Sequence, residues 1–289
     1  MLTLAVQVLV NGILLGGVYG VMALGMSLIW GVMRIINVAH GALIMLGAYF
    51  TFWTFTAWGW DPFLSLPATV VVFFALGYVI QRFVLNLVVQ AQLFLTLLIT
   101  FGLGVVMENV ARLAWSSDLR QITPSYEGAH FDVAGVTIPH VRLWVFCTAA
   151  VLSIAFLLLM ERTKLGRAIR ATSQELRAAR LTGVPVGHIY AVTFGLSAAL
   201  TGAAGAMLGT LFPFTPTMGG PLTLKSFAVN VLGGLGTMMG PLMGGVVLGV
   251  AESFTSTYLG PTYANVLSFG LLVLVLSIRP TGILGGRST

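Results

Sequence analysis

Long apolar segments constrain the fold of this chain more than any other feature of its sequence. A helix that crosses the hydrocarbon core of a bilayer needs about 20 predominantly apolar residues. Charged residues make up 8% of the chain and hydrophobic residues 57%, whereas water-soluble domains are about 25% charged. We therefore expect an all-α protein that crosses a membrane several times. Segments of sufficient length lie at roughly residues 4–31, 35–57, 66–88, 92–113, 141–160, 188–211 and 262–279.

A further apolar segment, at 222–256, is interrupted by glycines and by Pro241. It is compatible with one span, with a hairpin, or with two half-helices that dip into the membrane, and hydropathy leaves these alternatives open. We expect a single transmembrane domain over residues 1–289. Its fold would be a bundle of about 7–9 transmembrane helices that includes broken or re-entrant glycine-rich helices.

Loop charges predict the orientation of the chain, because Lys and Arg are enriched on the cytoplasmic side. Residues 161–187 carry six basic and two acidic side chains, a net charge of +4 out of the chain's +6. Residues 114–140 carry one basic and three acidic side chains, a net charge of −2. We therefore predict that the first loop is cytoplasmic and the second external. Alternation of the spans then places the amino terminus outside. The tail with Arg279 and Arg287 is inside if the segment 222–256 crosses the membrane an even number of times, or enters it and returns to the same side.

The cytoplasmic loop contains a segment with helical periodicity, TKLGRAIRATSQELRAARLTGV, from Thr163 to Val184. Gly183 followed by Pro185 predicts the end of a helix, with glycine in the left-handed position. Such a short amphipathic helix could rest on lipid headgroups, bind anionic lipid, or dock to a soluble partner. The polar stripe would contain Arg167, Arg170, Gln174 and Arg177, and the mostly apolar stripe Leu165, Ile169, Thr172 and Leu176.

Glycines recur at three- and four-residue spacing from Gly12 to Gly25 and again from Gly233 to Gly249. Small residues at this spacing allow helix backbones to approach closely, which predicts tight helix packing. An unwound segment at Gly233, Gly234 and Gly236 could in addition present backbone groups to a polar solute at mid-membrane.

Polar side chains inside apolar spans usually face the bundle interior or a water-filled cavity. Asn11, Asn37, His40, Asn230 and Asn265 are such residues. Each is a candidate for an interhelical hydrogen bond, and each is also a candidate for the translocation pathway or its gate.

Two acidic residues lie within apolar segments, and one segment of the external loop has the alternation of a β-hairpin. Glu108 and Arg112 are spaced i,i+4 and are predicted to pair, in preference to a role in a proton relay. Glu252 is an isolated acid without an evident partner in the sequence. The segment FDVAGVTIP, which alternates around Ala134 and Gly135, predicts a small β-hairpin in the external loop.

Motifs for catalysis, nucleotide binding or metal binding are absent from the sequence. No G-x-x-x-x-G-K-[ST] pattern occurs, and the nearest segment, GGPLTLKS, has Leu224 in place of the second glycine. No H-E-x-x-H or G-x-S-x-G pattern occurs, and the chain has one cysteine. We therefore expect no catalytic residue, no metal site and no cofactor bound by this chain, so that any ATP would be hydrolysed by another protein.

Three long segments, in the same order along the chain, resemble the permease subunits of ABC importers for branched-chain amino acids. The amino-terminal one reads GVYGVMALGMSLIWGVMRIINVAHGALIMLGAYF and includes the pattern from Asn37 to Gly41. The middle one reads GRAIRATSQELRAARLTGVPVGHIYAVTFGLSAALTGAAGAMLG. The carboxyl-terminal one reads NVLGGLGTMMGPLMGGVVLG. One departure is Ala42, where some family members have an acidic residue after the His-Gly pair.

The resemblance implies a multi-pass protein of the bacterial inner membrane whose cytoplasmic loop is a coupling helix for an ATPase. The implied partners are a second, different permease chain, two cytoplasmic ATPase subunits that bind ATP and Mg, and an external solute-binding protein; nucleic acid is not among them. The coupling residues implied by the resemblance are Gly166, Arg167, Arg170, Ala178, Ala179 and Gly183, with Arg177 beside them on the polar stripe.

The function expected from these observations is that of a permease subunit, not an enzyme, that translocates branched-chain or related amino acids with ATP hydrolysed by its partners. The alternative is an ion-coupled secondary transporter or channel for a small polar solute such as urea or an amide. That alternative calls for carboxylates deep in the spans without an obligate partner, a role for which Glu108 and Glu252 are the candidates. The sequence leaves open which solute is carried and whether the second permease half is another copy of this chain.

Overall fold

The computed structural model describes residues 2–89, 93–133, 135–278 and 282, and these residues form helices and one small β-hairpin. Within these described residues, seven of the helices are long and apolar enough to cross a membrane, as the sequence predicts. The long helices are α1 (Leu2–Met33), α2 (His40–Trp58), α3 (Pro62–Phe83), α4 (Leu93–Trp115), α5 (His140–Arg162), α8 (Val186–Leu211), α9 (Gly219–Gly233), α10 (Gly240–Tyr258) and α11 (Pro261–Ile278). The short elements are η1 (Leu85–Leu87), β1 (His130–Val133), β2 (Val136–Pro139), α6 (Lys164–Gln174), α7 (Leu176–Leu181) and η2 (Pro216–Met218).

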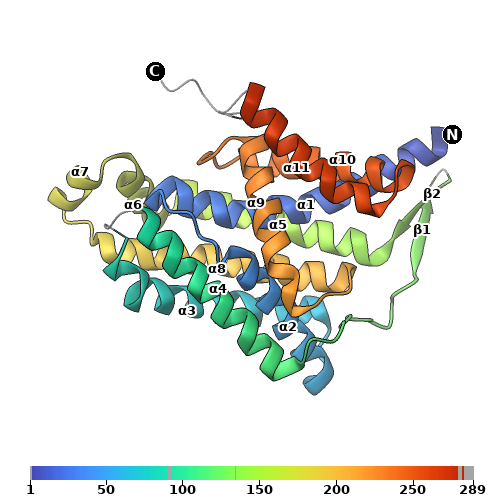
Figure 1. Cartoon of the computed structure of the whole chain (residues 1–289), viewed down its shortest axis with the longest axis horizontal. Coiled ribbons are helices and arrows are strands. Elements are labelled where there is room, and N and C mark those ends of the chain that lie inside the picture. The colour runs from blue at the N-terminus through green and yellow to red at the C-terminus, as the bar shows by residue number, and fades with distance from the viewer. Residues whose placement is uncertain (1, 90–92, 134, 279–281, 283–289) are drawn as a thin grey trace.

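Helices α1 and α8 form the centre of the bundle, with most of their side chains buried. They run alongside α5 in the long direction of the molecule (Figure 1). Helices α3, α4, α5 and α11 surround this centre and leave many large apolar side chains exposed. Exposed apolar helix surface is what a bilayer requires, because lipid chains solvate it as well as protein does.

The contact between α1 and α10 is a close approach of two antiparallel backbones. A Cβ atom added to Gly12 would lie 2.6 Å from Cα of Val250, and one added to Gly16 would lie 2.6 Å from Cα of Val246. From the other helix, a Cβ on Gly249 would lie 2.6 Å from Cα of Gly16. These distances confirm the predicted role of the glycine repeats in tight helix packing.

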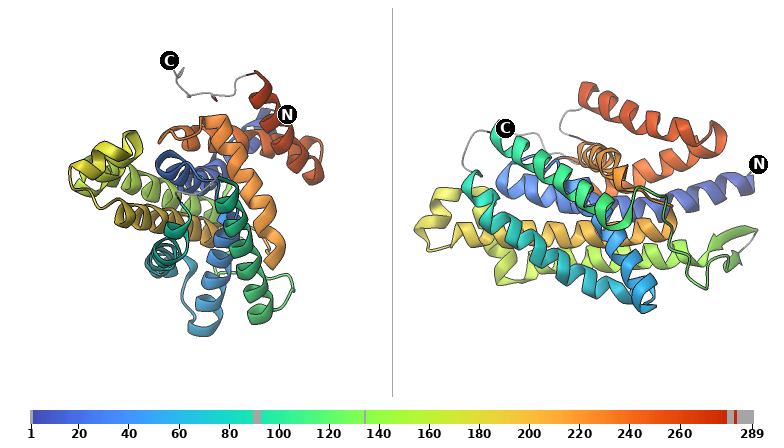
Figure 2. Two further views of the ribbon diagram at one scale, coloured as in Figure 1. Left: turned by 60° about the vertical axis from the view of Figure 1, so that its left-hand side comes forward. Right: turned by 60° about the horizontal axis from the view of Figure 1, so that its bottom comes forward.

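The segment 222–256 forms a helical hairpin, so the alternative of one continuous span is wrong. Helix α9 has 15 residues and is about 22 Å long at 1.5 Å per residue, which is shorter than the hydrocarbon core. It lies steeply across α1 and α8; Figure 2 (right) views it almost along its own axis while those two helices still run lengthwise. The turn to α10 needs glycine, since φ is +106° at Gly234 and +79° at Gly236.

Helix α2 begins at His40, later than the start of the predicted span 35–57. Helix α1 ends at Met33, and Arg34 has a φ of +54°. The chain then returns along α1, so that Nε2 of His40 lies 3.0 Å from the carbonyl oxygen of Met22, inside α1. The start of α2 is therefore within the bundle, beside the middle of α1.

The β-hairpin predicted in the external loop is present, with Val133 paired to Val136 and His130 to Pro139. It lies at the same end of the molecule as the amino terminus, whereas α6 and α7 lie at the opposite end (Figure 1). Gln7 of α1 holds the hairpin against this helix, because its Oε1 accepts a hydrogen bond of 2.7 Å from the Thr137 amide of β2. This relative placement agrees with the predicted topology, and the assignment of each end to a side of the membrane remains a prediction from charge. Ala134 and the tail residues Arg279 and Arg287 lie outside the described residues.

We predict that Gly249→Ala destabilises the protein by about 1–3 kcal/mol, because its Cβ would overlap the α1 backbone and overpack the contact. The matched control is Gly102→Ala on α4, where nothing lies within 4 Å of the new Cβ. The control is expected to be neutral or slightly stabilising, since alanine is favoured over glycine in a helix by about 1 kcal/mol. Thermal unfolding of the detergent-solubilised protein measures both, and equal melting temperatures would contradict the packing argument.

Candidate functional site

The predicted cytoplasmic helix consists of two helices, α6 and α7, which meet at Glu175. Glu175 has φ −148° and ψ +102°, so the helix is interrupted at this residue. The side chain of Glu175 accepts a hydrogen bond of 3.2 Å from the Arg177 amide and caps the start of α7. The prediction of one continuous amphipathic helix is therefore wrong, and Arg177 lies on a different helix from Arg167 and Arg170.

Helix α6 is fixed against the end of α5. Thr163 caps α6 by accepting a hydrogen bond of 3.0 Å from the Gly166 amide. A Cβ on Gly166 would overlap the backbone carbonyl groups of Leu159 and Met160, so the close contact requires glycine. Ile169, on the predicted apolar stripe, is fully buried. Because α6 also contacts α1 and α8, a force on α6 would act on the central helices.

The basic residues of the predicted polar stripe have different environments. Arg167 and Arg177 are exposed. Arg170 is half-buried and donates a hydrogen bond to the carbonyl oxygen of Met160. In helix α7, Ala178 is exposed, whereas Ala179 is buried. Of the residues predicted for coupling, Arg167, Arg177, Ala178 and Gly183 are therefore the exposed ones.

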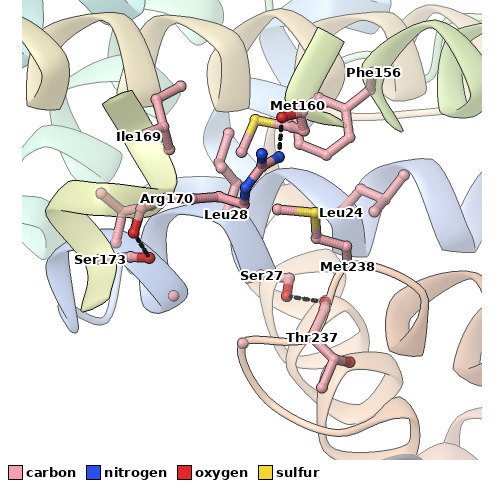
Figure 3. A pocket seen from close by; sticks show the side chains of 13 residues that line it. Leu24, Ser27, Leu28, Phe156, Met160, Ile169, Arg170, Ser173, Thr237 and Met238 are labelled. Carbon is pink, nitrogen blue, oxygen red and sulfur yellow. Dashed lines mark hydrogen bonds between the residues drawn. The ribbon is translucent and has the colours of Figure 1, made fainter. Parts of the chain in front are cut away.

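Arg170 also lines a small cavity of about 60 Å³ that separates α6 from the turn between α9 and α10. Figure 3 shows its guanidinium group turned toward Met160, with Met238 and Thr237 across the cavity. Ser27 of α1 donates a hydrogen bond of 2.9 Å to the Thr237 carbonyl oxygen. Residues of α1, α5, α6 and the α9–α10 turn thus meet around one cavity.

Helix α7 ends as the sequence predicts. Gly183 has a φ of +83°, which is the left-handed conformation that glycine adopts without strain. The Val184 amide donates to the Ala179 carbonyl oxygen at 3.0 Å, and the Gly183 amide to that of Arg180 at 3.1 Å. These two bonds form a Schellman motif, which satisfies the last carbonyl groups of the helix.

Two of the polar residues predicted inside the spans bind neighbouring carbonyl groups of α1. Nε2 of His40 lies 3.0 Å from the Met22 carbonyl oxygen, and Nδ2 of Asn230 donates to that of Ala23 at 3.0 Å. Both side chains are fully buried. This geometry supports the interpretation of interhelical hydrogen bonds for these two residues.

The other pathway candidates are distributed over three regions. Gly41 lies against the Gly219 backbone, so that α2 and α9 are in close contact there. Asn37 is buried in the connection before α2, and its Oδ1 accepts a hydrogen bond of 3.1 Å from the Ala39 amide. Asn11 lies toward the amino-terminal end of α1, apart from these residues. Gly233, Gly234 and Gly236 lie at the α9–α10 turn, where Gly233 packs against Gly240 and the other two have positive φ.

A partly buried ion pair was not identified from the sequence. Lys225 of α9 donates hydrogen bonds of 2.8 and 3.1 Å to the two carboxylate oxygens of Glu252 on α10. It also donates to the hydroxyl of Tyr19 in α1 at 3.1 Å. Each charged side chain is 13% exposed. The available signal was the isolation of one basic and one acidic residue in an otherwise apolar segment.

The same three polar groups line a cavity of about 410 Å³. Its other lining residues are apolar and come from the end of α8, the connection to η2, η2 itself and the first turn of α9. They consist of Leu208, Phe212, Pro213, Phe214, Met218, Pro221 and Leu222. Within the described ranges, no group of three His, Cys, Asp or Glu side chains lies close enough together to hold a metal ion.

We predict that Lys225→Met or Glu252→Gln alone destabilises the protein, whereas the double variant is closer to the wild type. Removing one partner leaves the other partly buried and unpaired, whereas removing both leaves no unpaired charge. Breaking a fully buried pair costs about 3–5 kcal/mol, and the loss here should be smaller, since each side chain is 13% exposed. Thermal unfolding of the four proteins in detergent forms a double-mutant cycle. Additive losses in the double variant would show that the pair does not interact.

Comparisons with known proteins agree on one family. The family model described as branched-chain amino acid transport system / permease component matches residues 8–276. The chain is 33% identical to the high-affinity branched-chain amino acid transport system permease protein BraD of Pseudomonas aeruginosa, over 96% of this chain and 95% of BraD. It is 32% identical to the permease protein LivH of Escherichia coli K12, over 96% and 95% of the two chains.

A more distant relative is the probable branched-chain amino acid transport permease protein LivH of Methanocaldococcus jannaschii, which is 26% identical over 96% of this chain and 92% of its own. No solved structure matches the chain. The two similarities above 30%, together with a family model that matches most of the chain, show that this protein belongs to the family of permease components of branched-chain amino acid transport systems.

Proposed function

We propose that this chain is the membrane permease subunit of an importer that carries branched-chain or related amino acids across the inner membrane, driven by ATP hydrolysed on partner subunits. The observation that carries the proposal is the α6–α7 segment at one end of the bundle. One side of this segment is exposed and carries Arg167 and Arg177. Its start, at Gly166, is packed against the end of α5. ATP and Mg would be bound by the partners, because the sequence offers no phosphate-binding loop.

The structure suggests how a movement of the ATPase would reach the membrane. The partner would bind the exposed side of α6 and α7, and α6 would transmit the displacement to α1, α5 and α8, which it contacts. The cavity beside Arg170 gives α6 space to move toward the α9–α10 turn. Coupling would then act by shifting the population between outward-facing and inward-facing arrangements.

The remaining partners would occupy the other surfaces. An external solute-binding protein would dock at the end that carries the β-hairpin, and a second permease chain would complete the pathway, as in the importers that the sequence resembles. The exposed apolar side chains of the outer helices provide surface for both the second chain and the lipid.

The alternative of an ion-coupled transporter or channel is less well supported. It calls for membrane carboxylates that lack an obligate partner, but Glu108 lies 2.5 Å from Arg112 and Glu252 lies 2.8 Å from Lys225. Both carboxylates named from the sequence are thus paired, and the pairing predicted for Glu108 with Arg112 is confirmed.

We predict that Arg167→Glu combined with Arg177→Glu lowers ATP-driven uptake. Reversed charge on the exposed side of α6 and α7 would weaken docking of the ATPase, while both side chains lie outside the packed interior. We expect at least a roughly 10-fold loss of ATP-driven leucine uptake in proteoliposomes, equivalent to about 1.4 kcal/mol of docking energy. The amount of inserted permease should not change.

The matched control is Arg82→Glu, an exposed residue in the last turn of α3, at the end of the bundle where α6 and α7 lie. It changes charge on the predicted cytoplasmic side beside Gly187 of α8 and not on α6 or α7, and uptake should stay close to that of the wild type. Unchanged uptake by the double variant, with normal co-purification of the ATPase, would contradict the docking role.

A further inference from the structure

The Lys225–Glu252 pair is unusual because α1 and four of the helices that contact it, α2, α8, α9 and α10, carry no other charged side chain. Within the bounds of α1, α2, α8, α9 and α10, these two residues are the only Asp, Glu, Lys or Arg. Tyr19, which binds the Lys225 ammonium, lies near the middle of α1. The pair is therefore at membrane depth, where ionised side chains are costly and commonly mark a pathway for a solute or an ion.

Structural stability alone is a weak reason for such a pair. Removing two charges from water costs several kcal/mol for each ion, and apolar residues of similar volume often give equal or greater stability. The contact between α9, α10 and α1 is already provided by the glycine packing and by the Asn230 hydrogen bond. A polar ligand that uses both charges would give the pair a function.

The cavity beside the pair has the dimensions and the lining of a small-molecule site. Its volume of about 410 Å³ lies within the range of roughly 300–1,000 Å³ that is usual for such sites. One wall presents an ammonium, a carboxylate and a phenol hydroxyl, from Lys225, Glu252 and Tyr19. The remaining lining residues are apolar, with Leu208, Phe214 and Leu222 among them.

We infer that this cavity is a binding site for a zwitterionic amino acid with an apolar side chain, inside the permease. The inference rests on the proposed function and assigns it a solute site. The ligand's carboxylate would bind the Lys225 ammonium and the Tyr19 hydroxyl, and its ammonium group would bind the Glu252 carboxylate. Its side chain would occupy the apolar part of the cavity.

The charges of the ligand explain why both an acid and a base are present. As the ligand enters, Lys225 and Glu252 each exchange their partner for the opposite charge of the ligand, so that neither ion is left unpaired. As the ligand leaves, Lys225 and Glu252 pair again with each other. A neutral solute such as an amide cannot replace either charge, so the site selects amino acids over urea and amides.

The test is a charge exchange, Lys225→Glu combined with Glu252→Lys, in the assembled transporter with its binding protein and ATPase subunits. Radiolabelled leucine uptake into proteoliposomes and binding-protein-stimulated ATP hydrolysis are measured together. The exchanged variant restores an ion pair, so a purely structural role predicts recovery of uptake. A ligand site predicts a loss of roughly 10-fold or more, because the two charged groups of leucine would meet the wrong partners relative to the apolar pocket.

The matched control exchanges the surface pair on α4, Glu108→Arg with Arg112→Glu, whose side chains are 31% and 41% exposed. It should transport leucine as the wild type does. A second variant, Lys225→Met with Glu252→Gln, removes the pair without leaving an unpaired charge and should also lose uptake while it remains folded by size-exclusion chromatography. Wild-type uptake by the exchanged or the neutral variant would overturn the inference.

The outcome also separates the inference from the proposed function. If the wild-type complex shows no ATP-driven leucine uptake, the proposed function fails, and the inference fails with it. If the wild type transports leucine and the exchanged variant does so equally well, the proposed function stands and the site assigned here is wrong.

Discussion

The close approach of other backbones to α1 is the contact on which the rest of the structure depends. Within a bilayer, the hydrophobic effect does not drive helices together, because lipid chains are as apolar as the side chains they surround. Close packing and interhelical hydrogen bonds must therefore hold the helices together. Helix α1 provides both. Its glycines lie against Val246 and Val250 of α10, and its Met22, Ala23 and Gly25 carbonyl oxygens bind His40, Asn230 and Ser197 from three other helices. The positions of α2, α8, α9 and α10 all follow from these contacts.

The α9–α10 hairpin connects the two functional regions. At its turn, Thr237 lies across a small cavity from Arg170 of α6, which is the segment proposed to bind the ATPase. Further along α9, Lys225 meets Glu252 beside the larger cavity. A displacement of the turn would therefore also act on the proposed solute site. The glycines at the turn are needed for the backbone geometry itself, since positive φ at Gly234 and Gly236 is strained for other residues.

Much of the architecture could be predicted from the sequence, because the signals are local. Span lengths, the end of α7 at Gly183, the β-hairpin and the pairing of Glu108 with Arg112 each depend on residues close together in the chain. Predictions failed where a single residue or a tertiary contact decided the outcome. Glu175 interrupts the cytoplasmic helix by capping α7 with its own side chain, although the periodicity continues through it. Helix α2 starts at His40 and not at residue 35, because the preceding segment returns along α1.

The sequence by itself determined that this protein is a helical membrane permease of a known family, with a basic loop at one end and glycine-lined packing surfaces. Hydropathy and motifs suffice for that conclusion, since they depend on residue type and spacing. Only the tertiary structure decided that Lys225 and Glu252 form a pair, that Tyr19 joins them, and that Arg170 faces inward while Arg167 and Arg177 do not. The reason is physical: helices that are apolar on every side carry little periodic signal for which face meets which neighbour, so the partners of their few polar groups are set by packing.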